Sequence, residues 1–336
     1  MTAARPVVAV IGLEDGPEAG AGPGVLACLD AARWRRLGVV AGINEAGAYR
    51  PGILDEVVRL PAPGAAGFLG ALLELVRSRE VRCVLPGSAA AAAALAAAAD
   101  ELREAGVGLR LARPRDGQPL ALAQGCRRAG VACLEFHELP AGFIPASFRL
   151  SLPAVIVGPG GRARAYDEWE AQRAAERLAA AAGPLACATF DPTRVFQVAV
   201  LAEAGRVLAA GAVRVLADDC RMRPWLALTV DSPALLDAAS RLSRAAELDG
   251  PAVLHFHQRG RAFLAAGVDP GFPMWVEVCR LDGPNLVELS VRQALGEAVA
   301  AAGVVPAGGL FSQTSDDLVV AADHPVRASL AGAQPR

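Results

Sequence analysis

The first third of the chain alternates short apolar segments with helical ones, and this alternation limits the fold more than any other feature. The apolar segments, which we predict as buried strands, are 6–12, 37–43, 55–60, 81–85 and 107–111. The helical segments between them are 24–35, 66–79 and 88–104, the last with Ser88 as its expected N-cap. Strands and helices that alternate with short loops pack as a parallel sheet with helices on both faces. Residues 1–113 are therefore expected to form an α/β, doubly wound domain.

The pattern changes between about residues 114 and 150, which is where we place the domain boundary. Beyond it, β segments are predicted at 131–136, 152–157, 185–190, 195–203 and 207–216, and helices at 116–129, 167–181, 233–247 and 286–302. A second, α+β domain is expected over residues 114–305. Residues 306–336 are expected to form a C-terminal tail with a weak strand at 317–322.

Charge and cysteine content exclude several functional classes. The chain has 33 basic and 35 acidic residues, so nothing favours binding to nucleic acid or to an anionic membrane surface. Every one of those basic residues is arginine, which excludes a Schiff-base or P-loop lysine. The seven cysteines are scattered and odd in number, as in proteins with reduced thiols. With no signal peptide and no apolar segment long enough to span a bilayer, the protein is expected to be cytoplasmic.

A β-hairpin is predicted at residues 252–268, with Gln258-Arg259-Gly260-Arg261 as its polar turn. His255 and His257 lie two residues apart on its first strand and so share one face. They are interpreted as pocket-lining or core imidazoles, or as part of a metal site. Asp269 follows the second strand, before Pro-Gly, and is either a turn residue or a ligand-binding one.

Several phrases along the chain resemble those of ATP-grasp proteins of the carbamoyl-phosphate synthetase type, in the same order. They are DEVVRLP at 55–61, VLPGS at 84–88, PAVIV at 153–157 with the glycine turn 158–164, TVDSPAL at 229–235, the hairpin, and LSVRQALG at 289–296. The resemblance covers about residues 5–300. It implies a pre-ATP-grasp doubly wound parallel sheet followed by an ATP-grasp-like α+β domain, with a lid subdomain at about 150–216.

The resemblance also implies ATP and Mg²⁺ as cofactors and assigns candidate residues to them. Gly160, Gly161, Arg162 and Arg164 correspond to the phosphate-binding glycine turn, and His255 and Asp269 are the candidate metal ligands, His255 in place of the first-strand ligand. At other positions this chain lacks the residue that the family has. Val157 stands where the family has a basic residue, and Val195 where it has a Glu on the adenosine side. Ala265 and Gly267 stand where it has a metal-binding Glu and a metal-binding Asn. Because no acidic residue lies between Gly250 and Val268, Mg-ATP binding is expected to be weak or lost.

Three functions remain open from the sequence. The first is a catalytically degenerate ATP-grasp protein that acts as a binding, scaffold or regulatory partner beside an amino-acid or peptide-modifying ligase. Its partner is then a protein or a small-molecule ligand. The second is an active ATP-dependent carboxylate–amine ligase with displaced ligands. The third is a nicotinamide-dependent enzyme, in which the glycines of GAGPG at 20–24 hold the dinucleotide and Glu45 meets its ribose.

Overall fold

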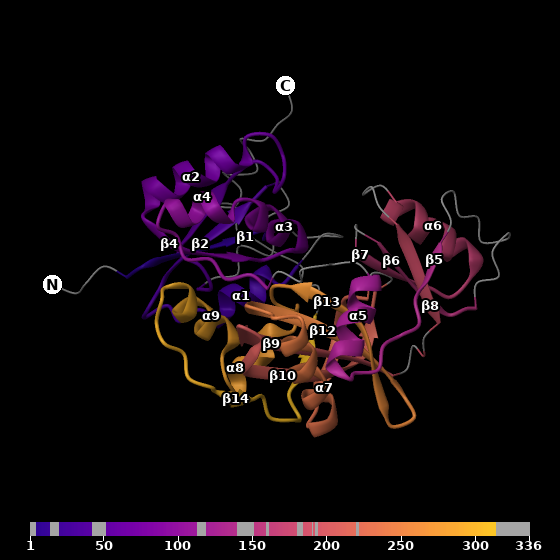
Figure 1. Ribbon diagram of the computed structural model, residues 1–336. Helices are drawn as coiled ribbons and strands as arrows, with labels where there is room; N and C mark the ends of the chain where they lie inside the picture. Colours follow the sequence, from indigo (N-terminus) through magenta and orange to yellow (C-terminus); the bar gives the residue numbers. More distant parts are fainter. Residues whose placement is uncertain are drawn as a thin grey trace, which may run out of the picture.

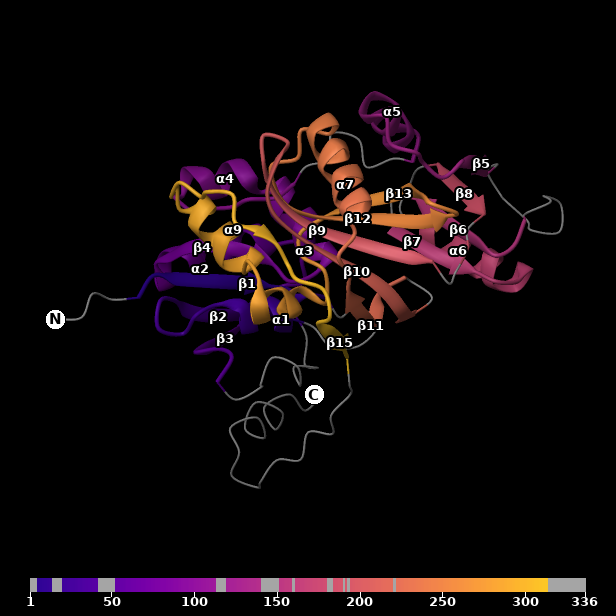
Figure 2. The same ribbon diagram turned by 90° about the horizontal axis from the view of Figure 1, so that it is seen from below.

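The computed structural model describes residues 5–13, 20–41, 52–112, 119–139, 151–158, 161–179, 184–189, 191, 194–219 and 222–313. These residues form three sheets, which we call the parallel sheet, the small sheet and the central sheet (Figures 1 and 2). The central sheet lies between the other two. Within the described ranges, no helix is long and apolar enough to cross a membrane.

The parallel sheet confirms the expected doubly wound α/β unit. Its strand order is β3-β2-β1-β4, and its strands are β1 (Val7–Ile11), β2 (Arg35–Val40), β3 (Glu56–Arg59) and β4 (Val81–Pro86). The helices that follow these strands are α1 (Gly22–Cys28), α2 (Phe68–Arg79), α3 (Ala89–Ala97) and α4 (Ala99–Glu104). As predicted, Ser88 caps α3, since its side chain accepts a hydrogen bond from the Ala91 N–H.

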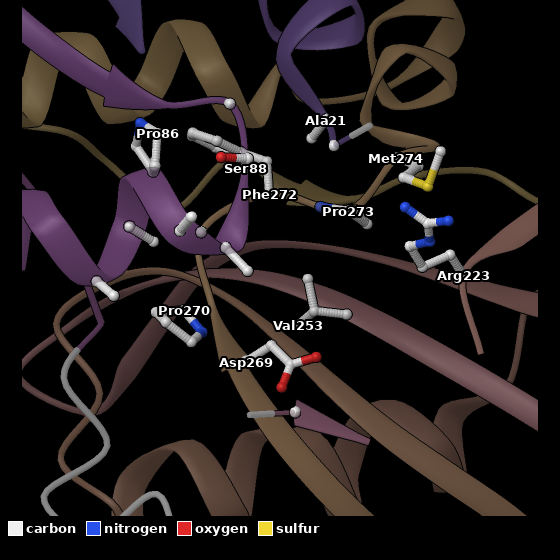
Figure 3. A pocket seen from close by; sticks show the side chains of 18 of the residues that line it. Ala21, Pro86, Ser88, Arg223, Val253, Asp269, Pro270, Phe272, Pro273 and Met274 are labelled. Atoms are coloured by element: carbon white, nitrogen blue, oxygen red, sulfur yellow. The ribbon is translucent and has the colours of Figure 1, made fainter. Parts of the chain in front are cut away.

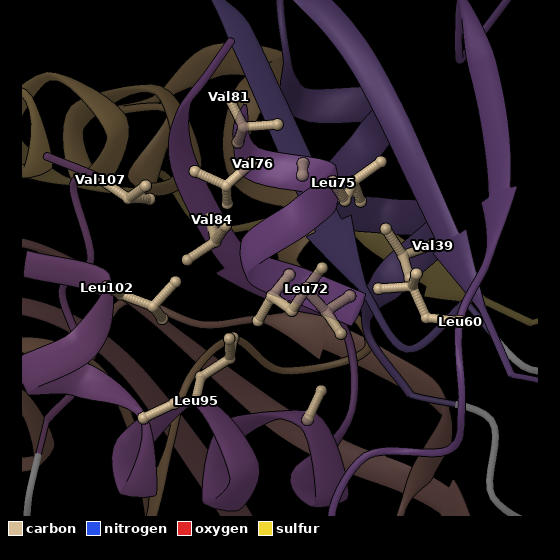
Figure 4. Packing of buried hydrophobic residues seen from close by; sticks show 14 of the residues in the cluster. Val39, Leu60, Leu72, Leu75, Val76, Val81, Val84, Leu95, Leu102 and Val107 are labelled. Atoms are coloured by element: carbon tan, nitrogen blue, oxygen red, sulfur yellow. The ribbon is translucent and has the colours of Figure 1, made fainter. Parts of the chain in front are cut away.

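Successive residues of β1 point to opposite faces, and both faces are covered. Helices α2, α3 and α4 pack on one face, where Leu72, Leu95 and Leu102 surround the strand residues (Figure 4). On the other face, Val8 and Val10 pack against α1 and a later helix, α9 (Leu286–Ala294). Burial on both sides explains why every residue of β1 is apolar.

The small sheet is antiparallel with strand order β5-β8-β6-β7. Its strands are β5 (His137–Leu139), β6 (Ala154–Gly158), β7 (Gly161–Ala165) and β8 (Leu185–Thr189), and α6 (Glu168–Ala179) covers one face. The predicted turn at 158–164 is wrong in its second half, because residues 161–165 form a strand paired with β6. Gly160 lies outside the described residues.

The central sheet has the strand order β13-β12-β9-β10-β11-β15, with β14 paired to β10. Its strands are β9 (Val195–Glu203), β10 (Arg206–Asp218), β11 (Pro224–Thr229), β12 (Gly250–Arg259), β13 (Ala262–Pro270), β14 (Gly303–Val304) and β15 (Leu310–Ser312). On one face lie α5 (Pro119–Ala129) and α7 (Pro233–Ala245). On the other lie α9, a short 3-10 turn (Val276–Val278) and α8 (Cys279–Asp282). The hairpin predicted at 252–268 is β12–β13.

Several element boundaries differ from the prediction for local reasons. Helix α1 ends at Cys28 because the Asp30 carboxylate accepts a hydrogen bond from the Ala32 N–H, which forms a turn before β2. Helix α9 ends at Ala294, with Gly296 at a φ of +82° that a glycine adopts easily.

Other differences are in the β segments. The predicted strands at 107–111 and 131–136 contribute one isolated bridge each, β11 and β15 were not predicted, and the strand at 317–322 falls outside the described residues.

Candidate functional site

A cavity of about 730 Å³ lies between the carboxyl end of the parallel sheet and the hairpin of the central sheet (Figure 3). The alanines of α3 and the corner at 86–88 form one wall. The opposite wall contains Val253, His255 and Asp269, and residues 271–274 close one side. The lining is mostly apolar, and the carboxylate of Asp269 is among its few charged groups (Figure 3).

The position of the cavity follows from the order of strands in the parallel sheet. From β1 the chain passes to β2 on one side, and β4 lies on the other side, so the connections diverge between β1 and β4. In open α/β sheets, ligands bind outside the carboxyl ends of the strands at such a point. The loops after β1 and β4, which contain Gly20 and Gly87, border the cavity.

The glycines of the loop after β1 permit close backbone packing. The Gly22 N–H donates to the Gly87 carbonyl oxygen at 2.9 Å, and a Cβ added to Gly20 would lie 2.1 Å from that same oxygen. The Gly22 N–H therefore donates to a backbone carbonyl oxygen of the protein and does not point at a phosphate site. Glu45, the residue proposed to meet a ribose, lies outside the described residues.

A chain of polar side chains runs from the core to the cavity wall. Trp275 Nε1 donates to Gln197 Oε1 at 2.8 Å, which turns the Gln197 amide nitrogen toward His255 Nδ1, 3.5 Å away. His255 Nε2 lies 2.8 Å from Asp269 Oδ2. Because the Gln197 amide can only donate, we assign Nδ1 as the acceptor and Nε2–H as the donor to Asp269. His255 is thus held as one neutral tautomer.

Arg162 completes this chain, since its Nη2 forms an ion pair with Asp269 Oδ1. Burial lowers the pKa of His255, and the Arg162 charge lowers it further, against the opposing effect of Asp269. Burial works against the ionised form of Asp269, but Arg162 and His255 hold its pKa well below the usual value. Asp269 is therefore a carboxylate at neutral pH, with its side chain 49% exposed toward the cavity, while that of Arg162 is 9% exposed.

The guanidinium of Arg162 lies directly over Gly267. A Cβ added to Gly267 would be 2.4 Å from Arg162 Nη1, 2.6 Å from Nη2 and 2.7 Å from Cζ. No larger side chain fits at this position unless Arg162 moves. Gly267 is the position to which the resemblance assigns a metal-binding Asn, and Ala265, assigned to the metal Glu, is fully buried. A cationic side chain of the protein covers this part of the hairpin.

Arg164 makes a second connection of the same kind. It forms an ion pair with Asp218, and its Nη2 also donates to the carbonyl oxygens of Asp218 and Asp219, at 3.3 and 3.1 Å. Burial raises the pKa of Asp218, although Arg164 partly offsets it. Arg162 and Arg164 alternate with Ala163 on β7, so both point away from the buried face of the small sheet.

We call Arg162–Asp269 and Arg164–Asp218 the bridging ion pairs, because each joins β7 of the small sheet to the central sheet. Of the sequence-predicted site residues, the structure brings together Gly161, Arg162, His255 and Asp269 at the cavity, while Arg164 points to the end of β10. His257 is buried, with its pKa lowered to about 4 chiefly by burial, and is not part of the cavity lining.

The donor set does not fit Mg²⁺. This ion prefers several oxygen ligands, whereas the hairpin offers one carboxylate already paired with Arg162 and one imidazole nitrogen that carries a proton. Among the described residues, no group of three or more His, Cys, Asp or Glu side chains is arranged to hold a metal ion. The two arginines assigned to the phosphates are each neutralised by a carboxylate.

Sequence reasoning missed three residues of the site. Gln197 and Trp275 orient His255, and Asp218 pairs with Arg164. Gln197 is the one polar residue in the apolar segment 195–202, and that was the available signal. Nothing in the sequence marks Trp275 or Asp218, because their partners are remote in the chain.

Comparisons with solved structures identify similar folds. An L-amino acid ligase from Bacillus licheniformis matches with a TM-score of 0.60 at 14% identity, over 88% of this chain and 75% of that one. The biotin carboxylase domain of 2-oxoglutarate carboxylase from Hydrogenobacter thermophilus, in complex with Mg-ADP, ADP and bicarbonate, matches with a TM-score of 0.64 at 14% identity, over 88% and 71%. N5-carboxyaminoimidazole ribonucleotide synthetase, in its ADP complex, matches with a TM-score of 0.60 at 11% identity, over 91% and 82%.

These matches confirm the ATP-grasp fold expected from the sequence: an N-terminal parallel domain followed by an ATP-grasp domain. No family model matches the chain, and no curated protein matches it by sequence. At identities of 10–14%, the likeness concerns the fold.

Proposed function

We propose that this protein is an ATP-grasp-fold binding protein that does not carry out Mg-ATP-dependent ligation. The observation that carries the proposal is the Arg162 guanidinium, which covers Gly267 and pairs with Asp269 on the hairpin. In this account a side chain of the protein supplies the positive charge that a metal ion supplies in an active ligase. Ala265 and Gly267, which replace the metal-binding Glu and Asn of the family, and the paired arginines support the same conclusion.

Electrostatics disfavour a triphosphate between the small and central sheets. If a phosphate replaces the carboxylate at Arg162 or Arg164, Asp269 or Asp218 loses its partner and faces the incoming negative charge. Separating a buried ion pair without replacing the lost partner costs about 3–5 kcal/mol. The ligand would have to supply free energy of this order to open the buried Arg164–Asp218 pair, and about 2 kcal/mol for Arg162–Asp269, whose carboxylate is 49% exposed and screened by solvent.

The ligand of the proposed binding protein occupies the cavity, whose volume of about 730 Å³ lies in the range typical of small-molecule pockets. Its apolar wall of α3 alanines suits a hydrocarbon side chain. Asp269 and Arg223 place opposite charges at the lining for a zwitterion, although each also forms an ion pair within the protein, with Arg162 and Asp219. One neighbouring structure is an L-amino acid ligase. We therefore assign the ligand to the amino acids or short peptides, with a regulatory or scaffold role beside a ligase that modifies them.

A second function, an active ATP-dependent carboxylate–amine ligase, is favoured by one specific observation. Arg162 Nη1 is buried and has no hydrogen-bond partner within the described part of the chain, so it retains one donor for an anion. Several neighbouring structures contain a nucleotide. In this case the bridging ion pairs open when the nucleotide binds.

Thermal shift measurements with a panel of amino acids and dipeptides, with Mg-ATP and with NADH separate these functions. We expect stabilisation by a member of the amino-acid or dipeptide panel, and none by either nucleotide. Ala93→Phe places a ring in the cavity and should abolish the shift. Ala97→Phe, on the same helix but outside the lining, is the matched control and should retain it. Stabilisation by ATP that requires Mg²⁺ would overturn the proposal in favour of the ligase.

A further inference from the structure

Two cysteines at the end of α5 lie against each other, apart from the cavity. Cys126 is on the last turns of the helix and is 1% exposed, whereas Cys133 is partly exposed. Cys126 belongs to the core cluster of the central sheet, Cys133 packs against that cluster, and the two thiols are close enough to influence each other's pKa. Both are free thiols in the structure.

The backbone after α5 brings the two residues together. Gly130 adopts a φ of +62°, and the Val131 N–H donates to the Cys126 carbonyl oxygen at 2.9 Å, which closes the helix in the way a C-terminal glycine permits. The chain then turns back along the hairpin. The Ala265 N–H donates to the Ala132 carbonyl oxygen at 2.8 Å, and the Leu134 N–H donates to the Ala265 carbonyl oxygen at 3.0 Å.

The surroundings of the two sulfur atoms differ in a way that separates their roles. The hydrogen bond from Cys126 stabilises the Cys133 thiolate and lowers its pKa; burial opposes this, and the charge of Arg127 adds to it. The same hydrogen bond and burial raise the pKa of Cys126. A thiolate-forming, partly exposed cysteine beside a second thiol is the arrangement found in peroxide-sensitive sites.

We propose that Cys126 and Cys133 form a redox-sensitive dithiol, in which Cys133 reacts with a hydroperoxide and Cys126 resolves the product as a disulfide. The Cys133 thiolate attacks one peroxide oxygen and the O–O bond breaks. This gives a sulfenic acid at Cys133 and hydroxide, which takes up a proton to become water. The Cys126 thiol then loses its proton and attacks the Cys133 sulfur, so that the S–S bond forms and a second water leaves. The two thiols supply two electrons, and the peroxide accepts both.

The oxidised residue, Cys133, lies in a segment that pairs directly with the hairpin. Cys133 forms an isolated parallel bridge with Ala265, two residues before Gly267, over which Arg162 lies. The disulfide ties the C-terminal end of α5 to the segment that pairs with this strand. The dithiol is independent of the proposed function, since it uses none of the cavity residues.

Peptide mapping of the full-length protein tests the proposal. Trypsin cleaves after Arg127 and Arg128, which lie between the two cysteines, so the disulfide joins peptides 116–127 and 129–149 that are otherwise separate. After treatment with an equimolar amount of hydrogen peroxide, we expect this linked pair, and we expect dithiothreitol to separate it. In Cys126→Ser, dimedone should label Cys133 as the trapped sulfenic acid. In Cys133→Ser, neither product should form.

Cys187 is the control, because it is buried and burial raises the pKa of its thiol. In the untreated wild type, iodoacetamide should alkylate Cys133 at least about tenfold faster than Cys187. Equal alkylation rates, or peroxide treatment that leaves peptides 116–127 and 129–149 unlinked, would refute the dithiol. The wild-type measurements need no variant, so a folding defect in a serine variant does not affect them.

Discussion

The Arg162–Asp269 ion pair predicts a measurable coupling free energy between the small and central sheets. The test is a double-mutant cycle of the wild type, Arg162→Met, Asp269→Asn and the double variant. Methionine preserves most of the apolar stem of Arg162 and removes its charge, while asparagine keeps the shape of Asp269. The cycle isolates the pairwise interaction from the other effects of each change.

The magnitude follows from the burial of the two groups. Opposite charges about 4 Å apart attract by about 4 kcal/mol at an effective dielectric constant of 20. Arg162 is 9% exposed, so its burial offsets part of this attraction, and Asp269 is 49% exposed, so solvent screens another part. We expect a coupling free energy of about 2 kcal/mol, above the range of about 0–1 kcal/mol for surface pairs.

Urea denaturation at pH 7 gives the free energy of unfolding for each of the four proteins, and hydrogen exchange of the β7 amides reports the attachment of the small sheet. Arg162→Met should increase exchange in β7 more than in β1. The exposed pair Arg241–Asp237 provides the control cycle and should show a coupling below about 1 kcal/mol. A coupling at position 162 no larger than in this control would refute the claim that the pair holds the two sheets together.

Three further predictions follow from individual residues. Gly267→Ala should displace Arg162, because the new Cβ would lie 2.4 Å from Nη1, and should abolish the coupling in the cycle above; an unchanged coupling would show that the guanidinium does not lie there. Gly87→Ala should destabilise the fold by about 1–3 kcal/mol, since its Cβ would lie 2.6 Å from the Gly12 carbonyl oxygen. Gly70→Ala, at a site with open space and no positive φ, is the control and should not destabilise it. Burial lowers the pKa of His257 from 6.5 to about 4, so between these pH values the unfolded protein binds a proton that the folded protein does not. The free energy of unfolding is therefore unaffected by protonation of His257 above pH 6.5 and falls by about 3 kcal/mol as the pH drops to 4. His257→Gln should show a smaller loss of stability in urea denaturation between pH 7 and pH 4.5.

The sequence predicts the parallel sheet and the hairpin well because their signals are local. Strand β1 is a continuous apolar segment that ends at a loop, and helices on both faces require that pattern. The hairpin has a polar turn between two apolar strands; the structure confirms the hairpin but shortens the turn to Gly260 and Arg261, because Gln258 and Arg259 pair with β13. The N-cap Ser88 was found for the same reason, since its hydrogen bond reaches only three residues along the chain.

The roles of Arg162 and Arg164 depend on partners that are far away in the sequence. Their spacing and the adjacent glycines predict a phosphate-binding turn. In the structure the same residues form β7, and their charges pair with Asp269 and Asp218. No local pattern contains these pairings, because they form only when the small sheet meets the central sheet. Gly267 illustrates the same limit, since the sequence shows that a ligand side chain is missing but not that a guanidinium covers the site.

Isothermal titration calorimetry of the wild type with Mg-ATP tests the central claim most directly, with the Mg²⁺ omitted in a parallel titration. If the bridging ion pairs fill the site with the protein's own charges, no saturable heat should appear, which corresponds to a Kd above about 1 mM. A saturable, Mg²⁺-dependent isotherm with a Kd in the range of about 1–100 μM would contradict the account and assign the chain to the active ligases.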